Sequence, residues 1–93
     1  MFDVNEYFEG KVKSLAFTAG NDRATIGVMA AGDYEFATSS IEHMTLISGQ
    51  MSVKLPTENA WRDIALNETF IVPADQSFLV KTTCDTAYLC VYK

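Results

Sequence analysis

Hydrophobic and polar residues alternate along this chain in short segments, and residues that favour turns separate one segment from the next. Alternation over about four to eight residues is typical of β-strands that have one face in a core. Helical spacing is scarce, so the pattern predicts an all-β protein. We expect about eight strands, at residues 10–17, 24–30, 33–38, 43–47, 51–55, 69–72, 78–81 and 86–92.

Between the predicted strands lie segments such as Gly20-Asn21-Asp22 and Ser48-Gly49-Gln50, whose residues are favoured in tight turns. About eight short strands in 93 residues favour a closed or double-sheet architecture, because closure removes exposed strand edges that would otherwise aggregate. Jelly-roll and cupin β-barrels have this architecture. The length suits one core, so we expect a single domain over residues 1–93.

Composition and charge exclude several classes of protein. The apolar share of 48% supports a buried core, but no apolar run approaches the roughly 18 residues that span a bilayer. Acidic residues stand at the start, where a secretory leader carries basic ones, so we expect a cytoplasmic protein without membrane contact. The net charge of −5 argues against nucleic acid as a partner, because that affinity comes mostly from Lys and Arg. A few cations in a cleft can still hold a small anion.

Cysteine and histidine are scarce. Cys84 and Cys90 would remain thiols in a reducing compartment, and we interpret them as small buried hydrophobic residues. With one histidine in the chain, His43, the usual Cys/His zinc site cannot be assembled.

The middle of the chain keeps the spacing of the first cupin motif, which is His-x-His, three or four residues, Glu, six residues and Gly. Glu42 is followed by six residues and then Gly49. The two histidine positions fall on Phe36 and Thr38.

The second cupin motif, Gly, five residues, Pro-x-Gly, two residues and His, maps onto Asn67, Pro73, Asp75 and Phe78. Glu42 is therefore the only potential ligand left among the four metal positions. One carboxylate cannot hold a transition metal against water, so we predict no metal and no other cofactor.

Phe36 and Phe78 would replace a metal cage by a partly aromatic pocket suited to a flat ring. The alternative is that both rings simply fill the core. Glu42 pointing into an apolar cavity would cost several kcal/mol unless something binds it there, which indicates a site. Its alternative is an exposed acid at a strand end.

A set of segments at characteristic spacing extends over nearly the whole chain. It comprises Asn5-Glu6-Tyr7-Phe8, Gly10-Lys11-Val12-Lys13-Ser14, Arg23-Ala24, Gly27-Val28-Met29, Gly32, Tyr34, Phe36, Thr38, Glu42, Met44-Thr45-Leu46-Ile47-Ser48-Gly49, Val53, Leu55-Pro56, Trp61, Phe70-Ile71-Val72-Pro73, Phe78 and Tyr88-Leu89-Cys90. In these segments the chain resembles the small pyrimidine/purine nucleoside phosphorylases of the cupin superfamily. The resemblance implies cleavage of many nucleosides by inorganic phosphate, which releases a free base and a pentose 1-phosphate. Asn67 and Asp75 depart from it where glycines are expected, and His43 departs from it where an acid is expected.

With this resemblance, Arg23 is the expected phosphate ligand, because a guanidinium matches two phosphate oxygens at once. Its alternative is a solvated arginine at a strand end. Thr38 and Ser39 could donate hydroxyls to the same anion, although loop polarity also explains Ser39. Glu42 would accept hydrogen bonds from the pentose and favour its developing positive charge, so Glu42 and Arg23 are the catalytic candidates.

Strand parity assigns the remaining candidates. Tyr34 shares the parity of Phe36, so its hydroxyl should also face the nucleoside, beside Phe36 and Phe78. His43 should face away from Glu42, and we leave it out of the site.

Two other functions stay open, namely a non-catalytic cupin that binds a small metabolite and a metal-free isomerase or lyase with Glu42 as base. We also expect a homodimer, because the core is small and the apolar stretch at residues 5–8 could dock on a neighbour.

Overall fold

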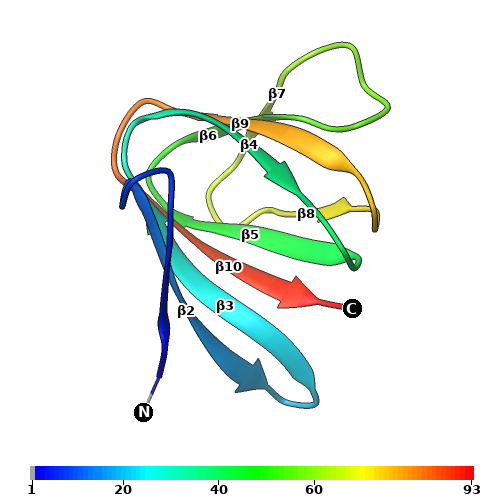
Figure 1. The fold of residues 1–93 in the computed structure, drawn as a ribbon. Coiled ribbons are helices and arrows are strands. Elements are labelled where there is room, and N and C mark those ends of the chain that lie inside the picture. The colour runs from blue at the N-terminus through cyan, green and yellow to red at the C-terminus, as the bar shows by residue number, and fades with distance from the viewer. Residues whose placement is uncertain (1) are drawn as a thin grey trace.

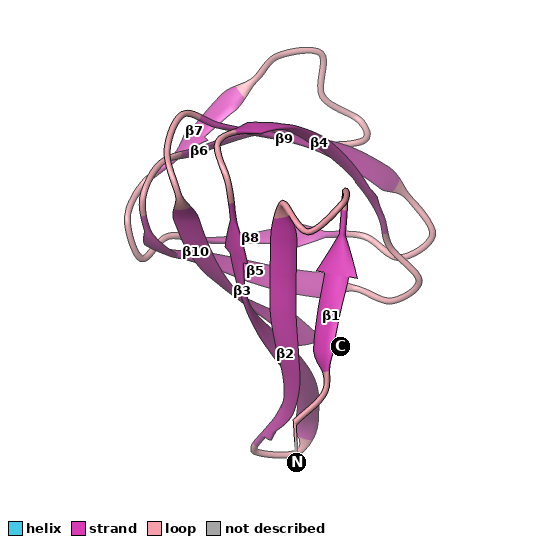
Figure 2. Cartoon of the chain, turned by 60° about the vertical axis from the view of Figure 1, so that its left-hand side comes forward, coloured by secondary structure: helices cyan, strands magenta, loops and turns pink. Residues whose placement is uncertain are grey.

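The computed structural model describes residues 2–93, and these form ten antiparallel strands and no helix (Figure 1; Figure 2). No segment among them is a helix able to cross a membrane. The strands are β1 (Val4–Tyr7), β2 (Val12–Ala19), β3 (Asp22–Met29), β4 (Gly32–Ala37), β5 (Glu42–Ser48), β6 (Met51–Lys54), β7 (Arg62–Ile64), β8 (Thr69–Val72), β9 (Ser77–Thr82) and β10 (Thr86–Tyr92). All eight predicted strands are present with ends shifted by at most two residues, and the short strands β1 and β7 were not predicted.

Two sheets face each other across the core (Figure 1). The larger sheet has six strands in the order β1-β2-β3-β10-β5-β8, and the smaller has four in the order β4-β9-β6-β7. Inward side chains alternate with outward ones, as in β9, where Phe78 and Val80 are buried and Ser77 and Lys81 are exposed. This alternation is the period-2 pattern that predicted the strands.

The core lies between the sheets. Its buried members are Val12, Met29, Tyr34, Met44, Leu46, Met51, Val53, Ile64, Phe70, Val72, Phe78, Val80, Tyr88 and Cys90. Both sheets contribute to it, which is why neither sheet would be stable alone.

Asn67 and Asp75, which depart from the second cupin motif, adopt the backbone conformation that glycine would take. Their φ angles are 68° and 59°. Asn and Asp are the residues other than glycine that tolerate the left-handed region best. The Asn67 amide donates to the Leu46 carbonyl at 2.7 Å, and the Asp75 amide donates to the Thr38 carbonyl at 3.1 Å. Both loops are therefore tied to the sheets despite the lost glycines.

The N-terminal segment pairs with its own chain, and docking of residues 5–8 on a neighbour stays a prediction. Strand β1 pairs antiparallel with β2, with Val4 opposite Leu15 and Tyr7 opposite Val12. At the turn after β1, the ring of Phe8 packs 5.0 Å from that of Tyr34. The ring of Phe8 thus contacts the chain's own aromatic residues on one side and is still 41% exposed.

Candidate active site

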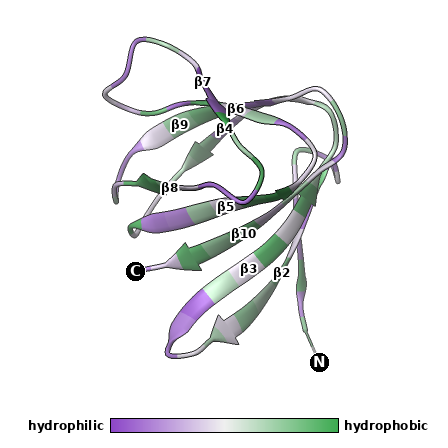
Figure 3. Ribbon diagram, turned by 180° about the vertical axis from the view of Figure 1, so that it is seen from behind, coloured by the Kyte–Doolittle hydropathy of each residue, from purple (hydrophilic) through white to green (hydrophobic). Residues whose placement is uncertain are grey.

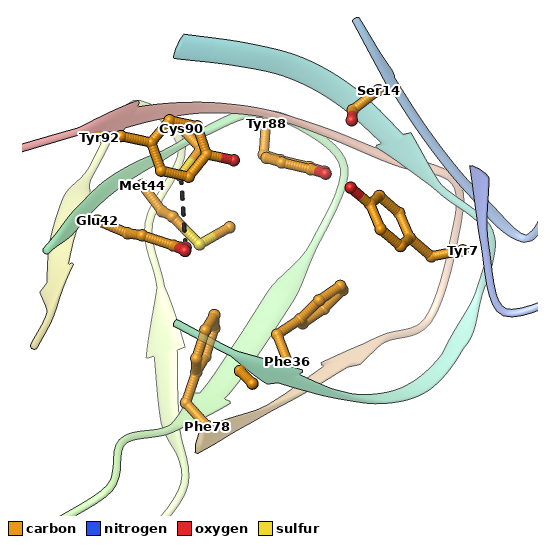
Figure 4. A pocket seen from close by; sticks show the side chains of 10 residues that line it. Tyr7, Ser14, Phe36, Glu42, Met44, Phe78, Tyr88, Cys90 and Tyr92 are labelled. Carbon is orange, nitrogen blue, oxygen red and sulfur yellow. Dashed lines mark hydrogen bonds between the residues drawn. The ribbon is translucent and has the colours of Figure 1, made fainter. Parts of the chain in front are cut away.

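A cavity lies between the two sheets where β4 and β9 approach β5 and β10 (Figure 4). Its volume of ≈ 130 Å³ greatly exceeds the roughly 10–15 Å³ that one water molecule needs. It is lined by Tyr7, Ser14, Phe36, Ala37, Glu42, Met44, Phe78, Tyr88, Cys90 and Tyr92.

One wall of the cavity is aromatic. Phe36 on β4 and Phe78 on β9 are register partners, with ring centroids 5.7 Å apart and an interplanar angle of 31°. Phe78 is buried and Phe36 is half-buried, so the pair belongs to the core and also offers surface to the cavity. Core packing and pocket lining, the two sequence-based alternatives, both hold for this pair.

The opposite wall is polar and carries Glu42. The thiol of Cys90 donates to Glu42 Oε1 at 3.5 Å (Figure 4). Burial raises the pKa of Glu42 above its usual value, and the Cys90 contact partly offsets that effect. A half-buried carboxylate on a cavity wall supports the site interpretation over that of an exposed acid at a strand end.

Burial and the neighbouring Glu42 raise the pKa of the Cys90 thiol to about 12. Cys90 is therefore a neutral donor, and its burial agrees with the sequence-based interpretation. For Cys84 that interpretation was wrong, because Cys84 is exposed in the turn between β9 and β10.

Tyr88 extends the polar wall and depends on a glycine opposite it. Gly27 on β3 is its register partner, and a Cβ at Gly27 would lie 2.5 Å from Tyr88 Oη. Burial, followed by the effects of Cys90, Tyr7 and Glu42, raises the pKa of Tyr88 to about 12. Its hydroxyl is thus neutral and can donate.

A second, more open groove of ≈ 700 Å³ adjoins the cavity and contains Arg23. It is lined by Asn5, Tyr7, Ala16, Asn21, Asp22, Arg23, Ala24, Thr25, Ser39, Ser40, Tyr92 and Lys93. Lys93 forms an ion pair with Asp22 at 2.6 Å, whereas no carboxylate of residues 2–93 pairs with Arg23. The Arg23 guanidinium is exposed and free to take an anion.

The two catalytic candidates lie in one cross-strand row. Tyr92 on β10 is the register partner of Arg23 on β3 and also of Glu42 on β5. Directly opposed residues share a face of the sheet, and adjacent strands are about 4.8 Å apart. Arg23 and Glu42 therefore flank Tyr92 on the inner face, with Arg23 in the groove and Glu42 in the cavity.

Two predicted site hydroxyls are engaged elsewhere. The Thr38 hydroxyl donates to the Pro73 carbonyl at 2.7 Å and accepts from the Gln76 amide at 3.1 Å. The Tyr34 hydroxyl donates to the Ala30 carbonyl at 2.6 Å. Neither residue lines the cavity or the groove, so their placement gives no support to the predicted substrate contacts.

Ser39, a predicted phosphate ligand, and His43, which was left out of the site, are the other polar residues weighed from the sequence. Ser39 is exposed and lines the groove with Arg23. His43 follows Glu42 on β5 and lines neither the cavity nor the groove, as its parity predicted.

Comparison with known proteins gives the family. The family model described as pyrimidine/purine nucleoside phosphorylase matches residues 2–92. A protein named pyrimidine/purine nucleoside phosphorylase from Pseudomonas syringae pv. syringae (strain B728a) is 56% identical over 93 residues, covering 100% of both chains. Another of that name, from Alcanivorax borkumensis, is 56% identical over 92 residues, covering 99% of this chain and 98% of its own. The chain belongs to the pyrimidine/purine nucleoside phosphorylase family.

Solved structures confirm the cupin-type all-β fold. A protein of unknown function from Vibrio parahaemolyticus has a TM-score of 0.95 and 38% identity, covering 100% of this chain and 99% of its own. A cupin-2 domain from Rhodospirillum rubrum has a TM-score of 0.75 at 14% identity, covering 98% of this chain and 69% of its own. The latter likeness concerns the fold alone.

In this member of the pyrimidine/purine nucleoside phosphorylase family, sequence reasoning missed the four cavity residues that carry a hydroxyl, namely Tyr7, Ser14, Tyr88 and Tyr92. The alternation of Tyr88, Cys90 and Tyr92 on the last predicted strand was a usable signal, because it places all three on one face. Residues 2–93 contain no group of three His, Cys, Asp or Glu that could hold a metal ion, and metal independence stays a prediction.

Proposed function

We propose that this protein is a nucleoside phosphorylase of broad specificity. It would cleave purine and pyrimidine nucleosides with inorganic phosphate and release the free base and α-D-ribose or deoxyribose 1-phosphate. The observation that carries the proposal is the row in which Arg23 and Glu42 flank Tyr92, opposite an aromatic wall. Homologues named for this activity support it.

The aromatic wall suits the base. Phe36 and Phe78 offer ring surface without hydrogen-bonding groups, and every nucleobase has a flat π-face. Discrimination between bases requires buried polar partners that reject the wrong one. A wall formed by Phe36 and Phe78 therefore favours acceptance of both purines and pyrimidines.

Glu42 suits the pentose. Its carboxylate can accept hydrogen bonds from sugar hydroxyls, and its charge would stabilise the oxocarbenium-like sugar as the glycosidic bond breaks. Arg23 would hold the phosphate dianion on the other side of Tyr92. A phosphate oxygen forms the new bond to the anomeric carbon as the C–N bond breaks, and the electron pair of that bond goes to the base. The base nitrogen then takes the proton that the hydrogen phosphate carried.

The proposal is tested by measuring free-base release from a panel of purine and pyrimidine nucleosides, with and without phosphate, on protein treated with a chelator. We expect release that requires phosphate and survives chelation. Loss of activity on chelation, with recovery on return of a metal, would contradict the predicted metal independence. Nucleoside binding without phosphate-dependent release would favour the alternative, a non-catalytic cupin that binds a small metabolite.

Arg23 supplies a second, sharper test. A charge-assisted bidentate contact is strong, so Arg23→Ala should raise the KM for phosphate about tenfold or more. Arg62→Ala is the matched control, because Arg62 is an exposed arginine on β7 in the other sheet. If phosphate dependence is unchanged in Arg23→Ala, the anion binds elsewhere.

We also propose a homodimer, with a second copy covering the outer face of the six-stranded sheet. Val4, Leu15 and Ile26 form one cross-strand row there, and they are 57%, 41% and 43% exposed. Along β3, Figure 3 shows hydrophobic residues beside paler and hydrophilic ones, and the exposed large hydrophobic side chains of that strand are Ile26 and Val28. A contiguous exposed apolar face of this kind is typical of an interaction surface.

A further inference from the structure

Tyr7 and Tyr92 line both the cavity and the groove, and Tyr92 is the one that lies between Arg23 and Glu42, on the central strand of the row. We propose that Tyr92 contacts both substrates, with its hydroxyl donating to the attacking phosphate and its ring bounding the pentose beside Glu42. This inference rests on the proposed phosphorylase function and assigns the residue that aligns the two reactants.

Placement is the first support. Tyr92 lines both the cavity that holds Glu42 and the groove that holds Arg23. A phosphate on Arg23 can reach a sugar on Glu42 only across the boundary between the two compartments. Tyr92 forms that boundary because it is the register partner of both residues. The reacting oxygen and the anomeric carbon should therefore meet at its side chain.

The hydrogen bonds of Tyr92 are the second support. Its hydroxyl lies 3.2 Å from Thr25 Oγ1, on the strand that carries Arg23 and at the groove side of the row. Thr25 is buried and Tyr92 is half-buried, so packing fixes this pair. When Thr25 donates to the Tyr92 oxygen, the phenolic proton is left free for a phosphate oxygen.

The protonation state of Tyr92 is compatible with that role. Burial raises the pKa of Tyr92, and the nearby Cys90 and Glu42 act in the same direction, while the Thr25 contact opposes them. The phenol therefore stays neutral at working pH and places no negative charge beside the anion. A neutral donor aimed at the nucleophile helps to hold it in line with the sugar.

Tyr92→Phe tests the proposal, since it removes the hydroxyl and keeps the ring. We expect the KM for phosphate to rise about tenfold and kcat to fall, with nucleoside affinity in the absence of phosphate unchanged. Tyr88→Phe is the matched comparison, because Tyr88 lines the cavity but not the groove. It should leave the KM for phosphate at the wild-type value.

Thr25 would act through Tyr92, and a second variant with its matched control tests this role. Thr25→Val should raise the KM for phosphate severalfold and add little in the Tyr92→Phe background, because the two changes break one interaction. Thr45→Val removes a hydroxyl from a comparable cross-strand pair, 2.6 Å from Thr69 and exposed rather than buried. It should leave both kinetic constants unchanged.

The outcomes separate this inference from the proposed function. If the wild-type protein releases no base with phosphate, the phosphorylase proposal fails. If the wild type is phosphorolytic and folded Tyr92→Phe keeps the wild-type KM for phosphate and kcat, the assignment of Tyr92 is overturned. Equal losses in Tyr92→Phe and Tyr88→Phe would also overturn it, since they would show a general need for phenols in the cavity.

Discussion

Glu42 shows at the scale of one residue how a site conflicts with stability. The carboxylate is drawn into a cavity whose opposite wall is Phe36 and Phe78, and burial raises its pKa. Cys90, a weak thiol donor, is its hydrogen-bond partner in the structure. An ionised Glu42 is therefore poorly compensated until a ligand supplies further donors, as pentose hydroxyls would.

Glu42→Gln should consequently lower turnover and raise stability at neutral pH. The folded-state pKa lies above the usual 4.5, so the folded protein binds this proton more readily than the unfolded chain. The contribution of Glu42 to stability is full below that usual pKa and is lost as the pH rises through the folded-state pKa. At pH 7 the charge costs stability, and glutamine removes that cost while keeping the size.

Thermal unfolding of wild type and Glu42→Gln across pH measures this effect. The variant should have the higher Tm at pH 7, and the difference should shrink toward pH 4. Its kcat should fall while the KM for phosphate persists, because stabilisation of the cationic sugar is lost. Glu35→Gln, an exposed acid on β4, is the control with the same charge change. A lower Tm for Glu42→Gln at pH 7 would contradict the argument.

At the scale of elements, the position of Tyr88 on the polar wall depends on how closely its ring packs against the neighbouring strand β3. The ring of Tyr88 crosses the backbone of Gly27, where a Cβ would lie 2.5 Å from Oη and 2.6 Å from Cε1. Only a residue without a side chain leaves room for this ring. The glycine is thus required by packing, since Gly27 is not among the residues with positive φ.

Gly27→Ala should destabilise the protein by about 1–3 kcal/mol, the usual cost of overpacking. Urea unfolding measures it, and a displaced Tyr88 should also change nucleoside binding. Combining Gly27→Ala with Tyr88→Ala removes the clash, so the double variant should lose less than the sum of the single losses. Simple additivity would show that the ring does not press on position 27.

For the whole molecule, the proposed dimer would form through the apolar outer face of the six-stranded sheet. Strand β1 adds Val4 to the row of Leu15 and Ile26. Ile26→Glu should therefore convert a dimer to a monomer without loss of fold, as seen by sedimentation velocity at micromolar concentration. Deletion through Phe8 should also weaken assembly, because it removes β1 from that face.

The matched control for Ile26→Glu is Leu79→Glu. Leu79 is partly exposed on β9 in the other sheet, away from the proposed dimer face. That variant should remain dimeric. A wild-type protein that sediments as a monomer would contradict the dimer proposal.

The sequence by itself determined the strands and the kinds of residue at the site. Alternation depends on neighbours a few positions away, so the chain shows it directly, and the cupin spacing located Glu42, Phe36 and Phe78. In the structure, Phe36 and Phe78 lie on one wall of the cavity and Glu42 lies on the opposite one. Asn67 and Asp75 can stand where the cupin motif has glycines, because their backbones accept the left-handed conformation.

Only the tertiary structure decided which residues meet. Thr25 and Tyr92 are 67 positions apart, and nothing local shows that β10 lies between β3 and β5. That pairing places Arg23 and Glu42 on either side of Tyr92. The hydroxyls of Tyr34 and Thr38 donate to the backbone carbonyls of Ala30 and Pro73, which the sequence does not show either. Strand register is set by burial across the whole core. The alternation along one strand predicts which face of the sheet a side chain lies on, but not which residue lies beside it on the next strand.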